Sequence, residues 1–345
     1  MLKMILRTAG LLLIFSLIVW QISTYADDHR SAQTSNDSTL PKVRVGVLVS
    51  GSVHWQVETL KKNGFDKQNG INVNVVPLGS VNALLVALQG DAVDFIVSDW
   101  VWVAKQRNKG RHFMFYPFST VLGGVVAPTS KNFVNVGDLL AKKVGVAGGP
   151  EGKSWLLLTA YAKKKFNIDL EKRSTIKFVA PPLVNALLDS QKLDAGLNYW
   201  HFNAVLDKSR YKELLSGQDI LSAFGVVDKV PMLGWVFQEK WAKQNSNIVD
   251  KFLAAINLAG QQLKNSDEAW AAIEYLLKTE QKKYSLVLRD EFRTGIVQEF
   301  GQLDVENMAA IFTVLEKSRV NDNVSKSSTP LPQDIFWRVK GDQGG

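Results

Sequence analysis

The sequence of 345 residues contains no cysteine, which excludes disulfide bonds, thiolate metal ligands and a lipid-acylated cysteine. Histidine is scarce too: there are four, and one of them, His29, lies near the N-terminus. Metal-binding spacings such as HExxH and the GxSxG turn of serine hydrolases are absent. Ser52, His54 and Asp99 meet only the loosest requirement for a catalytic triad. We therefore expect no metal, no cofactor and no catalytic residue, and we keep an enzyme only as a lesser alternative.

Long apolar runs are also missing, apart from one at residues 9–20. Lys3 and Arg7 precede this run and small residues follow it up to Ala26, which is the order of a secretory signal peptide. The run is short for a membrane span, so we expect residues 1–26 to be cleaved off, with an uncleaved anchor as the alternative. An exported chain without cysteine suits the bacterial periplasm.

No strong excess of one charge sign is left after such cleavage. Cleavage would remove two basic residues, Lys3 and Arg7, and no acidic residue. The full sequence has 41 basic and 33 acidic residues, so the basic excess would become smaller by two. Lysine runs such as residues 163–165 are typical of a solvated helix face, so we expect no nucleic-acid partner. Residues 27–40 are polar and aperiodic and indicate a flexible leader. About 300 residues follow, enough for two lobes with separate cores.

From Pro41 onward, apolar strand-like segments alternate with helix-like segments. The expected strands are residues 43–49, 71–76, 93–97, 143–147, 176–179 and 195–198, and the expected helices are residues 53–68, 81–88, 100–107, 183–189 and one ending near Phe166. This alternation predicts an α/β fold in which mostly parallel sheets are flanked by helices. Because the alternation of strands and helices starts again at Lys143, we expect two similar units.

An internal echo supports two units. VNALL occurs at residues 81–85 and again at 184–188, each time after a proline-containing turn and before a strand start with aspartate. After Pro231 and a short strand ending at Phe237, the sequence is typical of amphipathic helices. We expect a discontinuous first lobe of residues 41–124 and 231–320, a second lobe of residues 125–230, and a C-terminal extension of residues 321–345.

Residues 144–155, VGVAGGPEGKSW, are one glycine short of a phosphate-binding P-loop, because GxxxxGK[ST] would need glycine at Ala147. The segment opens the second unit, and the one strand that ends in aspartate, residues 95–99, comes before it. ATP is also scarce in the periplasm. We therefore interpret the segment as a glycine turn that presents a helix N-terminus, with Lys153 and Ser154 as candidate ligand contacts.

Three segments carry a family resemblance. Residues 87–95 read ALQGDAVDF, residues 136–146 read VGDLLAKKVGV, and residues 249–255 read VDKFLAA. In order and spacing they resemble motifs of the periplasmic substrate-binding proteins of ABC importers, in the nitrate, sulfonate and taurine branch, over residues 42–320. Residues 198–202, NYWHF, depart from the family's usual stretch ending in Glu-Pro, so the resemblance does not identify the substrate.

The resemblance implies the two-lobe clamp of the type II periplasmic-binding fold, with a helical C-terminal tail on the first lobe. Such a clamp closes over a small solute and delivers it to ABC permease subunits in the inner membrane. We expect a monomer that binds a small organic solute, such as a sulfonate, a taurine-like compound or another nitrogen or sulfur compound. A ligand sensor for a membrane receptor is the alternative, because a sensor also binds and closes.

The residues themselves indicate where the solute would lie. Ligands of open α/β sheets bind beyond the carboxyl ends of strands, where helix N-termini present unpaired N–H groups. The corresponding loops hold six of the ten tryptophans. The expected ligand-binding residues are Ser52, His54, Trp55, Asp99, Trp100, Trp102, Lys153, Ser154, Trp155, Asn198, Trp200, His201 and Trp235. We favour Trp55 and Trp200, which follow turn residues directly, whereas Trp100 and Trp102 cannot both face one cleft.

The polar groups in these loops are mixed in sign. Serines beside helix N-termini favour an anionic head group, whereas Asp99 favours an amine, although it is an equally good helix N-cap. An aromatic box around a quaternary ammonium would use the same tryptophans. The sequence leaves open whether the head group is anionic, cationic or zwitterionic.

Overall fold

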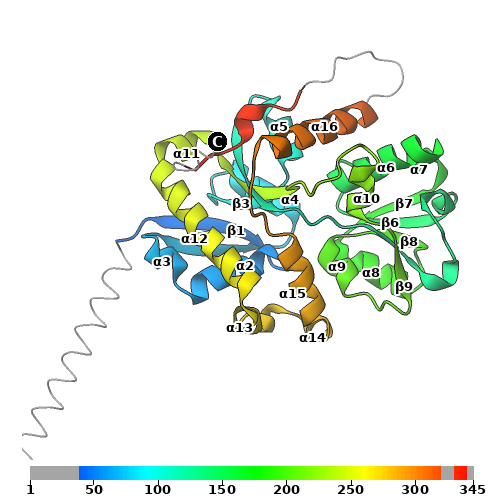
Figure 1. The fold of residues 1–345 in the computed structure, drawn as a ribbon, viewed down its shortest axis with the longest axis horizontal. Coiled ribbons are helices and arrows are strands. Elements are labelled where there is room, and N and C mark those ends of the chain that lie inside the picture. The colour runs from blue at the N-terminus through cyan, green and yellow to red at the C-terminus, as the bar shows by residue number, and fades with distance from the viewer. Residues whose placement is uncertain (1–38, 320–329, 340–345) are drawn as a thin grey trace, which may run out of the picture.

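The computed structural model describes residues 39–319 and 330–339, so the expected signal peptide lies outside the described residues. Figure 1 shows two lobes side by side, with the blue and yellow elements in one and the green elements in the other. Among the described residues, no helix combines the length and the hydrophobicity that crossing a bilayer requires.

The elements follow the α/β alternation that the sequence predicts. The strands are β1 (Lys42–Leu48), β2 (Asn72–Leu78), β3 (Ile96–Ser98), β4 (Phe113–Ser119), β5 (Val125–Pro128), β6 (Lys143–Ala147), β7 (Thr175–Val179), β8 (Ala195–Leu197), β9 (Tyr211–Leu215) and β10 (Leu233–Gln238). The α-helices are α2 (Val53–Lys62), α3 (Phe65–Gln68), α4 (Val81–Gln89), α5 (Trp100–Arg107), α6 (Lys153–Phe166), α7 (Leu170–Arg173), α8 (Pro181–Asp189), α9 (Trp200–Ala204), α10 (Gly217–Ser222), α11 (Glu239–Gln244), α12 (Ser246–Asn265), α13 (Asp267–Ala271), α14 (Thr279–Lys282), α15 (Ser285–Thr294) and α16 (Gln302–Arg319). Short 3₁₀ helices are η1 (Thr129–Lys131), η2 (Val136–Leu139), η3 (Glu274–Leu276) and η4 (Gln333–Ile335).

The prediction of a single helix over residues 53–68 is wrong in one respect, because the structure has two helices there, α2 and α3. The chain turns between them at Gly64, whose φ of 66° lies in the left-handed region that favours glycine. Asn63-Gly64 is a dipeptide typical of turns, so the sequence itself carries a signal for this break.

The sheets are mixed rather than purely parallel. In the first lobe β1 pairs with β2 in parallel, whereas β10 pairs with β3 and β4 in antiparallel fashion. In the second lobe the order is β7-β6-β8-β5-β9, with β5 antiparallel to both of its neighbours. The antiparallel pairs include the strands next to the lobe crossings: β4 and β5 flank the first crossing, and β10 follows the second.

The two lobes repeat one local arrangement. In the first lobe the carboxylate of Asp94 accepts a hydrogen bond of 2.7 Å from the backbone N–H of Arg44 in β1. In the second lobe the carboxylate of Asp194 accepts one of 2.9 Å from the backbone N–H of Lys143 in β6. The helices that precede these aspartates, α4 and α8, pack on the strands that donate these bonds, β1 and β6. The VNALL echo therefore reflects a repeated βαβ unit.

The C-terminal helices bridge the lobes. The long helix α12 packs on α2 and α3 of the first lobe, whereas α15 contacts α9 and α16 packs on α6, both in the second lobe. In Figure 1, α16 lies across the top of the molecule between α5 and α6. The last described segment returns to the first lobe, where Trp337 donates a backbone hydrogen bond of 2.9 Å to Phe115 in β4. The tail thus holds the two lobes together as well as covering the first.

Candidate functional site

A cleft with a volume of about 170 Å³ lies between the lobes, where strand ends and helix N-termini from both lobes meet. Its polar lining consists of Ser52, Ser98, Asp99, Lys153, Ser154, Tyr199 and His201. Its other lining residues are Gly46, Leu48, Gly51, Val53, Val81, Leu84, Val97, Val121, Leu122, Gly123, Trp200 and Leu233. The cleft is thus an apolar space with a few polar groups, as small-molecule sites commonly are.

One ion pair crosses the cleft. The Lys153 ammonium, at the first turn of α6, lies 3.5 Å from the carboxylate of Asp99, which precedes α5 in the other lobe. The same carboxylate caps α5 by accepting a 2.8 Å hydrogen bond from the backbone N–H of Trp102. Outside the lining, Lys105 lies 3.7 Å from Glu151, and this pair again joins α5 to the start of α6. The glycine turn of residues 148–152 therefore brings charges of the second lobe against the first.

Tyr199 and two glycines lie close together at the edge of the cleft. A side chain at Gly123, in the first crossing, would place Cβ only 1.8 Å from the backbone oxygen of Asn198. Gly148 lies beside the Tyr199 hydroxyl, and its φ of 95° is one that other residues adopt only with strain. Burial, with a smaller contribution from the charge of Asp99, raises the pKa of Tyr199, so this hydroxyl is a neutral donor at the cleft. A side chain at Gly123 would therefore displace the backbone at Asn198, whereas one at Gly148 would strain its own backbone.

His201 is the buried polar group without a partner in this cleft. Its side chain is 6% exposed, and neither ring nitrogen has a hydrogen-bond partner among the described residues. Burial lowers the pKa of His201 to about 4; the nearby Ser50 backbone opposes the shift, although its geometry falls short of a hydrogen bond. The ring is therefore neutral at pH 7, with one donor and one acceptor. Leaving such groups unpaired costs about 1–3 kcal/mol.

Trp200 is the one predicted tryptophan that lines the cleft. It belongs to the second lobe, but its ring meets Trp55 of the first lobe at a centroid distance of 5.9 Å and an angle of 83°. Trp55 itself does not line the cleft, because Trp270 and Phe292 enclose it at 5.1 and 5.7 Å. Trp55 therefore supports the wall that Trp200 forms.

The other predicted residues do not line the cleft, each for an identifiable reason. Trp100 is fully buried and donates a hydrogen bond of 3.1 Å from its indole to the Pro231 carbonyl. Asn198 is held by Pro181 and Asn185, at 3.0 and 2.9 Å. The remaining four are His54, which is half-buried on α2, Trp102, which packs on Phe113, Trp155, which packs on Phe178, and Trp235, which packs on Phe118 and Phe252.

Sequence reasoning missed the apolar walls and Tyr199. Leu48 ends β1, Val97 lies in the middle of β3, and Leu233 begins β10, so three strands contribute apolar walls. The rule that ligands bind beyond strand ends could have indicated Leu48. Leu233 could not be found in this way, because β10 is antiparallel to its neighbours.

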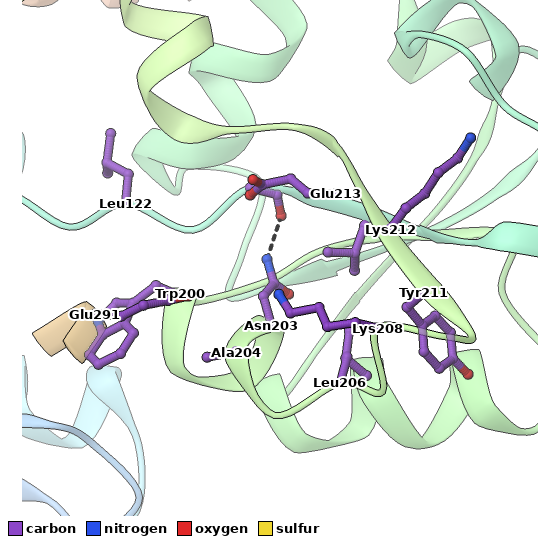
Figure 2. Close-up of a pocket in the computed structure, with 12 residues that line it drawn as sticks. Leu122, Trp200, Asn203, Ala204, Leu206, Lys208, Tyr211, Lys212, Glu213 and Glu291 are labelled. Atoms are coloured by element: carbon purple, nitrogen blue, oxygen red, sulfur yellow. Dashed lines mark hydrogen bonds between the residues drawn. The ribbon is translucent and has the colours of Figure 1, made fainter. Parts of the chain in front are cut away.

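A second, smaller cavity of about 80 Å³ shares two lining residues with the cleft, Leu122 and Trp200. Figure 2 shows Asn203, Lys208 and Glu213 reaching into this cavity, whereas Lys212 points away. The Asn203 amide donates a hydrogen bond of 2.9 Å to the Gly124 carbonyl, drawn as the dashed line. Glu291 enters from α15, and burial raises the pKa of both Glu213 and Glu291 while the charge of Lys208 opposes that shift.

No metal site is evident in the part of the chain that the structure describes, since nowhere do three or more His, Asp or Glu side chains converge as ligands. The chemistry that the cleft offers is recognition: an ion pair, three hydroxyls from serine, a phenol, a neutral imidazole and apolar walls.

Comparison with known proteins identifies a family and a fold. The family model described as NMT1/THI5 like matches residues 53–269. No curated protein sequence matches the chain. The ligand-binding component of an ABC-type import system from Staphylococcus aureus, with zinc bound, has a TM-score of 0.66 and 15% identity, over 87% of this chain and 97% of that one.

Two further solved structures have the same fold. The alkanesulfonate-binding protein SsuA from Xanthomonas axonopodis pv. citri, bound to MOPS, has a TM-score of 0.63 and 14% identity, over 86% of this chain and 98% of that one. The periplasmic nitrate-binding protein NrtA from Synechocystis PCC 6803 has a TM-score of 0.54 and 15% identity, over 71% of this chain and 68% of that one. The expected periplasmic-binding fold is therefore confirmed.

Proposed function

Since the chain belongs to the NMT1/THI5-like family, we propose that it is the periplasmic solute-binding component of an ABC importer. In this proposal the protein acts as a monomer, closes its lobes over a small organic solute and delivers that solute to a membrane permease. The similar folds of SsuA and NrtA, which are named as sulfonate-binding and nitrate-binding proteins, support this reading.

The observation that carries the proposal is the composition of the cleft. Both lobes contribute to its lining: Ser52 and Asp99 come from the first, and Lys153, Ser154, Trp200 and His201 come from the second. A solute in contact with both sets would stabilise the closed arrangement by its differential affinity for it. We propose these six residues as the ligand contacts.

Fluorescence titration of the purified protein tests the binding function. Trp200 lines the cleft and Trp55 packs against it, so a bound solute should change tryptophan emission. The probes are sulfonates, nitrate, betaines and aromatic acids, and calorimetry confirms each signal. Folded protein that responds to none of these classes would contradict the proposal, and turnover of a bound probe would favour an enzyme instead.

Import needs a separate experiment in cells. Deletion of the gene should abolish uptake of the labelled solute that the purified protein binds, and the intact gene should restore it. Unchanged uptake would contradict the import role while leaving the binding function in place, which is the result expected of a ligand sensor for a membrane receptor.

A further inference from the structure

The charged groups of the cleft already neutralise each other. Among the described residues that line it, Asp99 is the one carboxylate and Lys153 the one ammonium, and their side chains are 24% and 13% exposed. At 3.5 Å they form an ion pair between the lobes. The cleft therefore presents one positive and one negative group side by side, with no net charge.

A solute with a single charge would disturb this pair. An anion that binds Lys153 would leave the carboxylate of Asp99 close to a like charge, and a cation at Asp99 would leave Lys153 in the same position. Removing one partner from a largely buried ion pair is costly, because the other charge has lost its hydration and gained nothing. A solute without net charge avoids this cost, since it either leaves the pair intact or offers one charge to each member.

The imidazole of His201 points to the same class of solute. It is 6% exposed, it lines the cleft, and neither ring nitrogen has a hydrogen-bond partner among the described residues. A neutral imidazole offers one donor and one acceptor, so a matching solute presents one of each. Its neighbours are aromatic: Trp200, Tyr199 and Phe202 lie at centroid distances of 5.4, 6.2 and 4.5 Å.

We infer that the cleft selects a solute without net charge, either zwitterionic or uncharged, whose hydrogen-bonding group pairs with His201. The inference rests on the proposed function, that is, on binding of a small solute in this cleft. It narrows that function, because simple sulfonate, nitrate and carboxylate anions would bind poorly. The walls of Leu48, Val97 and Leu233 would cover the apolar part of the solute.

Calorimetric titration with two matched panels tests the charge preference. The aliphatic panel is taurine, ethanesulfonate, ethylamine and ethanesulfonamide, and the aromatic panel is para-aminomethylbenzoate, para-toluate, para-methylbenzylamine and para-toluamide. In a panel that binds, the zwitterion or the amide should bind at least about tenfold more tightly than the anion and the cation. Which of the two binds distinguishes a zwitterionic solute from an uncharged one.

Charge variants test the cause of the preference. Asp99→Asn keeps a good helix cap but removes the negative charge, so it should shift the preference toward the anion by about tenfold. Lys153→Gln should shift it toward the cation. Lys105→Gln is the matched control: it breaks the outer pair with Glu151, lines no part of the cleft and should leave the preference unchanged.

His201 is tested by two variants. His201→Phe keeps an aromatic ring in the aromatic surroundings but loses both nitrogens, and it should weaken binding of the preferred probe by at least about tenfold. His201→Gln keeps a donor and an acceptor and should restore most of the affinity. Unchanged affinity in a folded His201→Phe protein would overturn the role of the imidazole.

The outcomes separate the inference from the function on which it rests. An anion that binds wild-type protein as tightly as its zwitterionic and uncharged counterparts would overturn the inference and leave solute binding intact. The same conclusion would follow if Asp99→Asn left the preference unchanged. Wild-type protein that binds no member of either panel and none of the wider set of probes would overturn the proposed function itself.

Discussion

In each lobe a short strand leads into a helix whose first residue is tryptophan: β3 leads into α5 at Trp100, and β8 leads into α9 at Trp200. In the first lobe Asp99 caps the helix, and Trp100 is fully buried, where it donates a hydrogen bond to the Pro231 carbonyl. In the second lobe Tyr199 makes no capping hydrogen bond, and Trp200 lines the cleft.

The same kind of strand-to-helix turn therefore has a different role in each lobe. Trp100 ties the first lobe to residue 231 in the second crossing, and its ring lies 6.3 Å from that of Phe312 in α16, so it holds distant parts of the chain together. Trp200 instead reaches out of its own lobe and packs on Trp55. The next position differs in the same way, since Val101 is buried in an apolar core whereas His201 is buried without a hydrogen-bond partner among the described residues.

Among the variants that test this difference between the two turns, replacement of Trp100 should have the largest effect, which is on stability. Trp100→Ala removes a fully buried indole and its hydrogen bond, so we expect the free energy of unfolding to fall by about 4 kcal/mol. Denaturant unfolding without ligand measures this loss. Protein that remains folded should keep its solute affinity, because Trp100 does not line the cleft. A loss below about 1 kcal/mol would mean that Trp100 does not anchor the crossing.

The pH dependence of stability should distinguish His201 from Val101. The pKa of His201 is about 4 in the folded protein and about 6.5 when unfolded, so the unfolded chain binds more protons between these values. The contribution of this group to stability is complete above pH 6.5 and is lost as the pH falls toward 4, in total about 3 kcal/mol.

Unfolding measured at a series of pH values checks this contribution. His201→Phe cannot titrate at this position, so its free energy of unfolding should fall less than that of the wild-type protein between pH 6.5 and 4. Equal slopes for the two proteins would contradict the burial of a neutral ring.

The fold could be predicted from the sequence because its signals are local. The α5 helix covers residues 100–107 as expected, since its cap and its periodicity lie within the segment itself. The positions of β5 and β9 could not be predicted, because each depends on a partner strand far away in the sequence. The turn at Gly64 was missed although Asn63-Gly64 is a dipeptide typical of turns.

The candidate site was predictable only as a set of loops. Asp99, Lys153 and Trp200 lie where the strand-end rule places them. The rule cannot distinguish Trp100 from Trp200, because what decides between core and cleft is contributed by distant residues: Pro231 and Phe312 enclose the first ring, whereas Trp55 supports the second. Tertiary packing, which a single sequence does not display, therefore determines which aromatic residue is available to a solute.

Replacement of Trp200 should instead change the affinity for the solute, because Trp200 lines the cleft. Trp200→Ala removes one wall of the cleft and opens it toward the smaller cavity, so we expect the affinity for the bound solute to fall by about 2 kcal/mol, or roughly 30-fold. Calorimetric titration measures the change, and Trp241→Ala is the control, because Trp241 packs on Phe95 away from the cleft. Unchanged affinity in Trp200→Ala would show that Trp200 has only a structural role. An equal loss in both variants would instead indicate that altered packing of the first lobe, and not direct contact, weakens binding.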